Sequence, residues 1–259
     1  MKRLFCTILI VLSLCPFAQA QYPVMMHSHN DYAQMAPFWL AYSQRAHSVE
    51  CDMFYVGGSK FLIGHGRDDF SYNQVFDDWY LNPIVQIYRY NHGRAWADDD
   101  KNYLQLCIDI KSDNADAFVK ALVKKLRKYP DVFDSNVNPL ACRVVIGCEP
   151  KNFDRYPSII SFDGSIFIDY TPAQLDRVAL ISEYFGQFSH WDGKESLPTE
   201  DEQKIKAAID KAHSLGKPIR FWEAPDNPTA WQKLIELGAD YINTDKPAEC
   251  AAFLKGLDQ

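Results

Sequence analysis

Short apolar runs alternate with amphipathic stretches along almost the whole chain. The runs that predict β-strands cover residues 24–29, 48–55, 61–65, 104–110, 143–147, 158–162 with 166–169, 181–185, 218–222 and 241–244. Most of these runs are continuously apolar, which is typical of parallel strands that are buried on both faces. The pattern therefore favours a parallel sheet covered on both sides.

Amphipathic stretches between these runs predict helices over residues 35–45, 115–129, 173–179, 200–215 and 229–237. Asn114 and Thr199 are candidate N-caps, and Gly216 and Gly238 stand where a helix C-terminus favours a left-handed residue. A strand followed by a helix, repeated seven or eight times, favours a TIM (β/α)8 barrel over an open doubly wound sheet. Without a linker or a fixed repeat, the sequence predicts one α/β domain.

The first twenty residues have the pattern of a secretory signal peptide. Lys2 and Arg3 precede an apolar run over residues 4–15, and Ala18-Gln19-Ala20 has the small-x-small form of a cleavage site. A membrane anchor is the alternative, but the run is shorter than the roughly 20 residues needed to span a bilayer. We therefore expect a secreted or periplasmic protein, with a barrel domain over residues 21–259 and no transmembrane segment after cleavage.

Composition narrows the function classes. The chain has 259 residues, 47% of them hydrophobic, and a formal net charge of -7. That charge disfavours a nucleic-acid partner, which would need many cations, but it leaves room for a single bound phosphate. Five cysteines follow the signal segment, in or beside apolar runs, so buried thiols are favoured over one or two disulfides. No CxxC pair supports a zinc site.

Charged residues concentrate at the predicted strand ends, where the active sites of such barrels lie. Glu50 and Asp52 are two residues apart, so both carboxylates point to the barrel interior, and Asp109 and Lys111 repeat this spacing on the next strand. Three carboxylates suit one hard divalent cation, Ca²⁺ or Mg²⁺, better than zinc. The alternative is a buried salt-bridge network in which Lys111 neutralises Asp109 or Asp52.

Two histidines flank this acidic cluster. His29 and His65 end neighbouring elements, so their rings can face the same mouth and exchange protons near neutral pH. Surface or supporting roles are expected for the other five, which are His27, His47, His92, His190 and His213. Near the mouth, Trp222, Trp191 and Tyr32 could stack on a ligand or simply pack.

These motifs resemble the glycerophosphodiester phosphodiesterase family, within the superfamily of phosphatidylinositol-specific phospholipase C. The resemblance rests on the order His29-Asn30, Glu50-x-Asp52, Gly-His65, Asp109-x-Lys111, Trp222 and Thr244-Asp245-Lys246-Pro247. Ser28-His29-Asn30-Asp31-Tyr32 and Phe162-Asp163-Gly164 look closer still to secreted bacterial proteins and fungal relatives of the altered-inheritance-of-mitochondria type. The resemblance covers residues 24–250.

The resemblance implies a TIM barrel with a metal-assisted acid–base site. The implied roles are catalytic for His29 and His65, substrate-binding for Asn30, Lys111 and Trp222, and metal-binding for Glu50, Asp52 and Asp109. The family normally has arginine where Asn30 stands and glutamate where Asp109 stands, and a PEN motif that is absent here. Phosphate would then be held by Lys111, Asn30 and the metal, with Arg67 or Arg220 as candidates outside the motif.

The sequence thus predicts a secreted phosphoric diester hydrolase that cleaves a P–O bond of a glycerophosphodiester or phospholipid head group. A barrel that binds phosphate or a glycan without turnover is the alternative, because the arginine is missing. A glycoside hydrolase also uses paired carboxylates but does not need the histidine pair. The sequence leaves open the head group, the choice between Ca²⁺ and Mg²⁺, which histidine is the acid, and the oligomeric state.

Overall fold

Eight parallel strands close into a barrel in the computed structural model, which describes residues 24–69, 73–148 and 150–257. The ring order is β1, β9, β8, β7, β6, β5, β4, β2, and pairing of β2 with β1 closes the ring. The strands are β1 (Met25–Ser28), β2 (Ser48–Gly57), β4 (Gln105–Ile110), β5 (Arg143–Gly147), β6 (Ile160–Gly164), β7 (Val178–Tyr184), β8 (Ile219–Trp222) and β9 (Tyr241–Thr244). This confirms the predicted TIM barrel.

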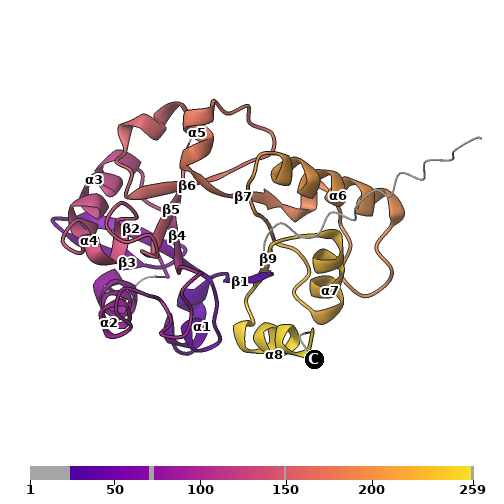
Figure 1. Cartoon of the computed structure of the whole chain (residues 1–259), viewed down its shortest axis with the longest axis horizontal. Helices are drawn as coiled ribbons and strands as arrows, with labels where there is room; N and C mark the ends of the chain where they lie inside the picture. The colour runs from indigo at the N-terminus through magenta and orange to yellow at the C-terminus, as the bar shows by residue number, and fades with distance from the viewer. Residues whose placement is uncertain (1–23, 70–72, 149, 258–259) are drawn as a thin grey trace, which may run out of the picture.

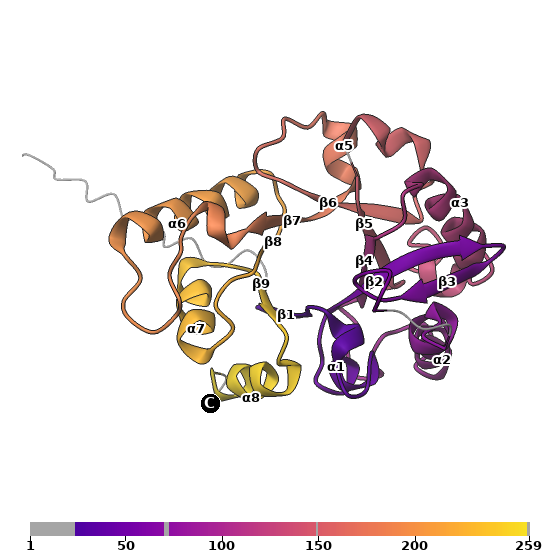
Figure 2. The ribbon, with the colours of Figure 1, turned by 180° about the vertical axis from the view of Figure 1, so that it is seen from behind.

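The remaining strand, β3 (Lys60–Ile63), is antiparallel and pairs with the outer part of β2. Figure 2 shows the resulting hairpin between α3 and α2. The hairpin extends past the carboxyl end of the barrel strands, so it carries the residues that follow β3 to the mouth of the barrel.

Helices cover the outside of the barrel (Figure 1). They are α1 (Trp39–Ser43), α2 (Asn82–Tyr90), α3 (Ala115–Leu126), α4 (Pro130–Phe133), α5 (Pro172–Arg177), α6 (Thr199–Ser214), α7 (Pro228–Leu237) and α8 (Pro247–Leu257). Shorter turns are 3₁₀ at Asp31–Ala33, Pro150–Arg155 and Phe185–Gln187, and π-helical at Asp77–Leu81. The last helix, α8, contacts α1, so the two ends of the described chain meet. None of the helices in the described ranges could cross a membrane.

Local signals explain several helix ends. Asn114 caps α3 by accepting a hydrogen bond from the backbone N–H of Ala117 at 3.0 Å, as predicted. Gly238, at φ +100°, ends α7, and Gly216, at φ +69°, follows the last turn of α6. Thr199 is not the N-cap of α6 but its first residue, because Pro198 holds the extended cap position.

Four elements differ from the sequence prediction. Residues 67–100, where no helix was predicted, include α2 and the π-helical turn. Residues 166–169 form a turn, and β7 begins at Val178 because α5 ends at Arg177. Helix α8 was not predicted. The predicted signal peptide at residues 1–20 lies outside the described residues.

The apolar core lies mainly between the sheet and the helices. A smaller apolar cluster of Cys107, Val145, Leu180 and Tyr241 lies apart from it, on strands of the barrel. Buried polar residues such as His27, Ser48, Gln105 and Arg220 share these strands. The barrel strands therefore bury both apolar and polar side chains. The five cysteines of the described residues are free thiols, four of them buried.

Candidate active site

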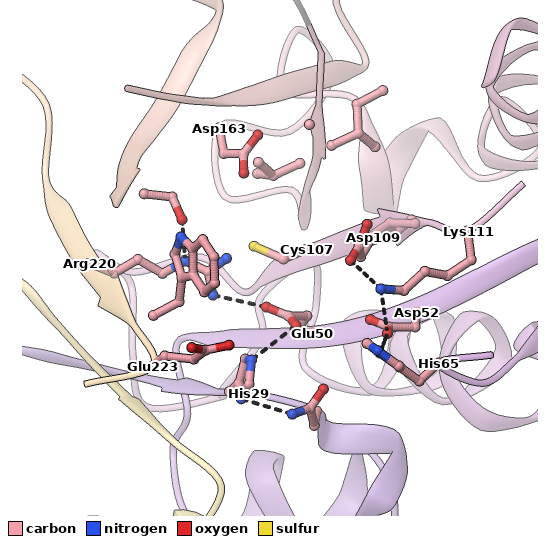
Figure 3. Close-up of a pocket in the computed structure, with 17 residues that line it drawn as sticks. His29, Glu50, Asp52, His65, Cys107, Asp109, Lys111, Asp163, Arg220 and Glu223 are labelled. Atoms are coloured by element: carbon pink, nitrogen blue, oxygen red, sulfur yellow. Dashed lines mark hydrogen bonds and ion pairs between the residues drawn. The ribbon is translucent and has the colours of Figure 1, made fainter. Parts of the chain in front are cut away.

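A cavity of about 500 Å³ opens at the carboxyl ends of the barrel strands (Figure 3). All eight predicted site residues line it. The full lining is His29, Asn30, Glu50, Asp52, His65, Cys107, Ile108, Asp109, Lys111, Val145, Ile146, Gly147, Asp163, Ser182, Arg220, Trp222 and Glu223. The structure thus brings together residues spread over nearly two hundred positions of the chain.

Glu50 lies at the centre of one buried charged group. Its Oε2 accepts a hydrogen bond from Nη1 of Arg220 at 2.9 Å, and its Oε1 is 3.7 Å from Nε2 of His29. Burial alone would raise the pKa of Glu50, but the charge of Arg220 and the hydrogen bond with His27 outweigh it and hold that pKa well below its ordinary value. Glu50 is therefore ionised.

His27 belongs to the same group and has a supporting position in the barrel interior, with no exposed surface. Nε2 of His27 lies 3.0 Å from Oε2 of Glu50 and beside Nη1 of Arg220, and Nδ1 lies 2.7 Å from Oγ of Ser48. Burial first, and the charge of Arg220 second, lower the pKa of His27 to about 3. The ring is therefore neutral and helps to fix Arg220 beside Glu50.

Arg220 is held by four side chains. Besides Glu50 and His27, its Nε donates to Oγ of Ser182 at 2.9 Å and its Nη1 to Oδ1 of Asn243 at 3.2 Å. Its other terminal nitrogen, Nη2, has no hydrogen-bond partner among the described residues, and the side chain lines the cavity. Arg67, the other candidate phosphate ligand, instead pairs with exposed Asp113 at 2.8 Å and does not line the cavity.

Asp52 anchors a second charged group on the opposite side of Glu50. Its Oδ2 lies 3.1 Å from Nζ of Lys111, 3.1 Å from the hydroxyl of Tyr32 and 2.8 Å from Nδ1 of His65. Lys111 also donates to Oδ2 of Asp109 at 2.7 Å. Burial opposes a charge on Lys111, but the two carboxylates outweigh it and raise the pKa of its ammonium group. The salt-bridge network considered from the sequence is therefore present.

The two predicted catalytic histidines are held in the same way. Nδ1 of His29 is 2.9 Å from Oδ1 of Asp245, and Nδ1 of His65 is 2.8 Å from Oδ2 of Asp52. Each ring is thereby oriented by a carboxylate through Nδ1, which leaves Nε2 available for other groups. Burial lowers the pKa of His29, but Asp245 and Glu50 outweigh it, so the net shift is upward.

Asp245 was quoted in the sequence motif but not predicted as a site residue. It directly follows β9, which is the ring neighbour of β1, and this adjacency places it beside His29. Asn30 donates from Nδ2 to the same carboxylate at 3.4 Å and adopts the left-handed conformation at φ +46°. Such strain in a residue other than glycine is a feature that clusters at functional sites.

No site role was predicted from the sequence for three other residues that line the cavity. Asp163 of β6 and Cys107 of β4 line the cavity, as does Glu223, which follows β8 at φ +55°. Trp222 packs against Tyr184 with ring centroids 4.6 Å apart and presents part of its surface to the cavity. Trp191 is not part of the lining; its indole N–H donates to the backbone oxygen of Glu195.

The predicted metal ligands fit a divalent cation in their donor chemistry. Glu50, Asp52 and Asp109 offer only carboxylate oxygens, and Oδ1 of Asp52 is buried without a hydrogen-bond partner among the described residues. Of the described residues that line the cavity, five carry carboxyl groups and two, Lys111 and Arg220, are permanent cations. As the side chains lie, however, no three His, Cys, Asp or Glu residues of the described ranges converge as a metal site. Binding a cation would therefore require a side chain to turn.

Comparisons with known proteins agree with this architecture. Crystal structures of glycerophosphodiester phosphodiesterases from Parabacteroides distasonis and Silicibacter pomeroyi superpose with TM-scores of 0.52 and 0.54, each at 13% identity. The first match covers 93% of this chain and 100% of that chain, and the second covers 92% and 94%. At this identity the likeness supports the fold alone.

Sequence relatives are proteins called altered inheritance of mitochondria protein 6. The Lachancea thermotolerans protein is 23% identical over 85% of this chain, and an Arthroderma benhamiae homologue is 26% identical over 86%. The matches cover 63% and 81% of those two relatives, so this chain spans less than two thirds of the first.

Two family models match the sequence. The glycerophosphoryl diester phosphodiesterase family matches residues 218–248, which include β8, β9 and the start of α8. The AIM6-like phosphodiesterase domain matches residues 16–154, more than half of the chain, and these residues supply His29, Glu50, Asp52, His65, Asp109 and Lys111. The chain therefore belongs to the family of AIM6-like phosphodiesterase domains.

Proposed function

We propose that this chain is a metal-dependent phosphodiesterase that cleaves a P–O bond of a glycerophosphodiester or phospholipid head group. The observation that carries the proposal is the matched pair of His29 and His65. Each ring is bound through Nδ1 to an aspartate, and both line one cavity with Lys111 and Arg220. Two such imidazoles and two cations are the groups that acid–base cleavage of an anionic diester needs.

Proton transfer would be the task of the two histidines. One takes the proton of the nucleophile, a water or a vicinal hydroxyl of the substrate, and the other gives a proton to the leaving alcohol oxygen. Asp245 and Asp52 are positioning residues in this scheme, because each holds a ring by Nδ1, and Asp245 also raises the pKa of His29.

Phosphate binding would fall to Lys111 and Arg220, with Asn30 beside His29. Lys111 and Arg220 both line the cavity, and Nη2 of Arg220 has no hydrogen-bond partner among the described residues. Arg220 supplies from β8 a guanidinium that the sequence lacks at position 30. Trp222 would pack against the apolar part of the substrate.

The cation would be held by Glu50, Asp52 and Asp109, with the unpartnered Oδ1 of Asp52 as one donor. When bound, Ca²⁺ or Mg²⁺ polarises a nonbridging phosphoryl oxygen and offsets the negative charge of the cavity. We also propose that the chain is exported, on the strength of the apolar run and Ala18-Gln19-Ala20 near its N-terminus.

A barrel that binds phosphate without turnover is the second candidate. The ion pairs of Lys111 with both Asp52 and Asp109 favour it, because they already neutralise two of the carboxylates that a metal would need. Both candidates place phosphate in the same cavity, so activity separates them.

The test is release of nitrophenolate from bis(4-nitrophenyl) phosphate and of alcohol from glycerophosphodiesters. The assays are run with Ca²⁺, with Mg²⁺ and with EDTA. The phosphodiesterase proposal expects turnover that EDTA abolishes and added cation restores. Phosphate binding without turnover under any of these conditions would support the second candidate, and turnover that EDTA does not affect would remove the metal from the scheme.

A further inference from the structure

Asp163 lies on the wall of the cavity that faces away from the proposed reaction centre. In the closed ring, β6 is the fourth strand from β1 in either direction, so Asp163 and the strand before His29 stand on opposite sides of the barrel. Figure 3 shows the Asp163 carboxyl apart from the two contacts that link Arg220 to Glu50 and Lys111 to Asp52.

The cavity has two unlike halves. Strands β8, β1, β2 and β4, with the segments that follow them, supply the histidines, both cations and most of the carboxylates. Strands β5, β6 and β7 supply Val145, Ile146, Gly147, Asp163 and Ser182, among which Asp163 is the ionisable side chain. This second half is a mostly neutral pocket wall with one carboxyl group.

The Asp163 carboxyl forms no ion pair with a cationic side chain of the described residues. No hydrogen bond or ion pair joins its carboxyl to another side chain of the described residues, and the charge of Arg220 acts on it only through space. Gly147 stands opposite it in the register with β5, and a Cβ atom at Gly147 would lie 3.4 Å from Oδ1 of Asp163. The missing side chain keeps the approach to this carboxyl open.

The geometry of displacement at phosphorus indicates which part of the substrate could contact Asp163. The attacking and leaving oxygens lie in line, and both must reach the histidines. The nonbridging oxygens belong with Lys111 and Arg220. With water as the nucleophile, the alcohol that stays on phosphorus is then directed to the remaining wall, formed by β5, β6 and β7.

We propose that Asp163 is a specificity-determining residue that hydrogen-bonds a hydroxyl group on the alcohol that stays on phosphorus. The inference rests on the proposed function for the orientation of the substrate. It assigns a preference for hydroxyl-bearing alcohols, such as a polyol, over alkyl alcohols of the same length.

A hydroxyl group suits this carboxyl better than an ammonium group does. Burial, with Asp109 and Glu50 adding to it, raises the pKa of Asp163, so its environment disfavours the charged form that an ammonium partner requires. A hydroxyl can donate to an ionised carboxylate and accept from a protonated one. A hydroxyl group therefore forms a hydrogen bond with Asp163 in either protonation state, whereas an alkyl chain leaves the carboxyl without a partner.

The test compares three esters of nitrophenyl phosphate whose second alcohol is 3-hydroxypropyl, propyl or 3-aminopropyl. The leaving group is identical and the 3-hydroxyl is not vicinal to the ester oxygen, so differences in kcat/KM report recognition of the retained alcohol rather than attack by its own hydroxyl. We expect the wild-type chain to prefer the hydroxypropyl over the propyl ester by about tenfold or more, the worth of one hydrogen bond to a carboxyl group. Asp163→Ala should remove this preference and leave the propyl ester within about twofold of wild type.

Asp169→Ala is the matched control, because this exposed aspartate follows the same strand and does not line the cavity. Asp163→Leu, which is close to aspartate in shape and cannot form a hydrogen bond, replaces Asp163→Ala if thermal denaturation shows that the alanine variant does not fold. An equal loss on both esters, an unchanged preference, or a larger Asp163-dependent preference for the aminopropyl ester would overturn the inference.

Binding separates this inference from the proposed function. If the wild-type chain hydrolyses none of the esters, the proposed function fails, and calorimetric titration with hydroxypropyl phosphate and propyl phosphate still examines Asp163. Tighter binding of the hydroxyl compound that is lost in Asp163→Ala supports the inference. Equal binding of the two compounds contradicts it.

Discussion

Nη1 of Arg220 lies 2.9 Å from Oε2 of Glu50, and this ion pair joins β8 to β2 across the barrel. The two strands are not ring neighbours, because β9 and β1 lie between them. Both side chains are at most about one-tenth exposed, and Arg220 and His27 hold the pKa of Glu50 below its ordinary value against the effect of burial. The pair therefore acts as an internal brace beneath the mouth of the cavity.

Removal of one partner should destabilise the barrel strongly. Breaking a buried ion pair leaves an uncompensated charge and costs about 3 to 5 kcal/mol. We expect Arg220→Met and Glu50→Gln each to lower the free energy of unfolding in urea by an amount near this range. The double variant should lose clearly less than the two single losses combined, because neither charge is then left alone.

Lys194→Met supplies the control for that cycle. Lys194 and Asp192 form an exposed pair at 2.8 Å, with side chains 79% and 58% exposed, and such pairs contribute about 1 kcal/mol or less. If Arg220→Met costs no more than Lys194→Met, or if the two single losses simply add, the bracing role of the Arg220–Glu50 pair is wrong.

If His29 and His65 transfer protons, replacing either of them should lower kcat. His29→Gln and His65→Gln should each lower kcat on bis(4-nitrophenyl) phosphate by about 10²- to 10⁴-fold, the usual contribution of a general acid or base. His190→Gln, at an exposed position outside the cavity, should leave kcat unchanged. Full turnover in either cavity variant would remove that ring from the proton transfer.

Asp245→Asn examines how His29 is positioned. The hydrogen bond and charge of Asp245 raise the pKa of His29 against the opposing effect of burial. The amide variant removes that charge, so the limb of the pH–rate profile governed by His29 should move to lower pH, together with a fall in kcat. A purely structural role for Asp245 would change stability and leave the pH profile where it was.

Metal binding can be measured without turnover. A ligand that binds only the folded state at about 100 times its Kd adds about 2.7 kcal/mol of stability. For a chain of this size that should raise Tm by several degrees. We expect this shift with Ca²⁺ or Mg²⁺, its reversal by EDTA, and its loss in Asp52→Asn.

Asp113→Asn is the matched control for that shift, since this exposed aspartate pairs with Arg67 outside the cavity. A Tm that no divalent cation moves would leave Lys111, already within 3.1 Å of Asp52 and 2.7 Å of Asp109, as the cation of this site.

The fold was predictable because each strand carries its own apolar run and turn residues. The exceptions have local causes. The segment that becomes the π-helical turn and α2 contains Pro83, which suggests a break, yet proline is tolerated in the first turn of a helix. Residues 166–169 are apolar but form a turn, because Ser165 and Ile166 bind Glu183 of the neighbouring strand.

The sequence predicts which site residues share a face of the same strand. The two-residue period places Glu50 and Asp52 on the inner face of a strand, and the structure confirms that both line the cavity. That period does not say which strands face each other. Arg220 beside Glu50, Asp245 beside His29 and Asp163 on the far wall all depend on ring order and register. His27 did carry a signal, since it shares the inward face of His29.

Asp31 fixes the loop that follows His29 and Asn30, and the last prediction concerns its stability. This fully buried carboxylate accepts hydrogen bonds from the backbone N–H of Phe38 at 2.5 Å, from the hydroxyl of Tyr80 at 2.9 Å and from Oγ of Ser28 at 2.9 Å. Phe38 is held at φ +62°, a conformation that needs such an anchor.

Asp31→Ala should leave these three buried donors unsatisfied and lower the free energy of unfolding by about 2 kcal/mol or more, since each unsatisfied group costs about 1 to 3 kcal/mol. Asp68→Ala is the control, because this aspartate is exposed rather than buried. Loss of the anchor should also release Asn30 from its left-handed conformation and so reduce kcat in the folded variant. An Asp31→Ala chain with unchanged urea midpoint and unchanged kcat would show that the loop holds its shape without this carboxylate.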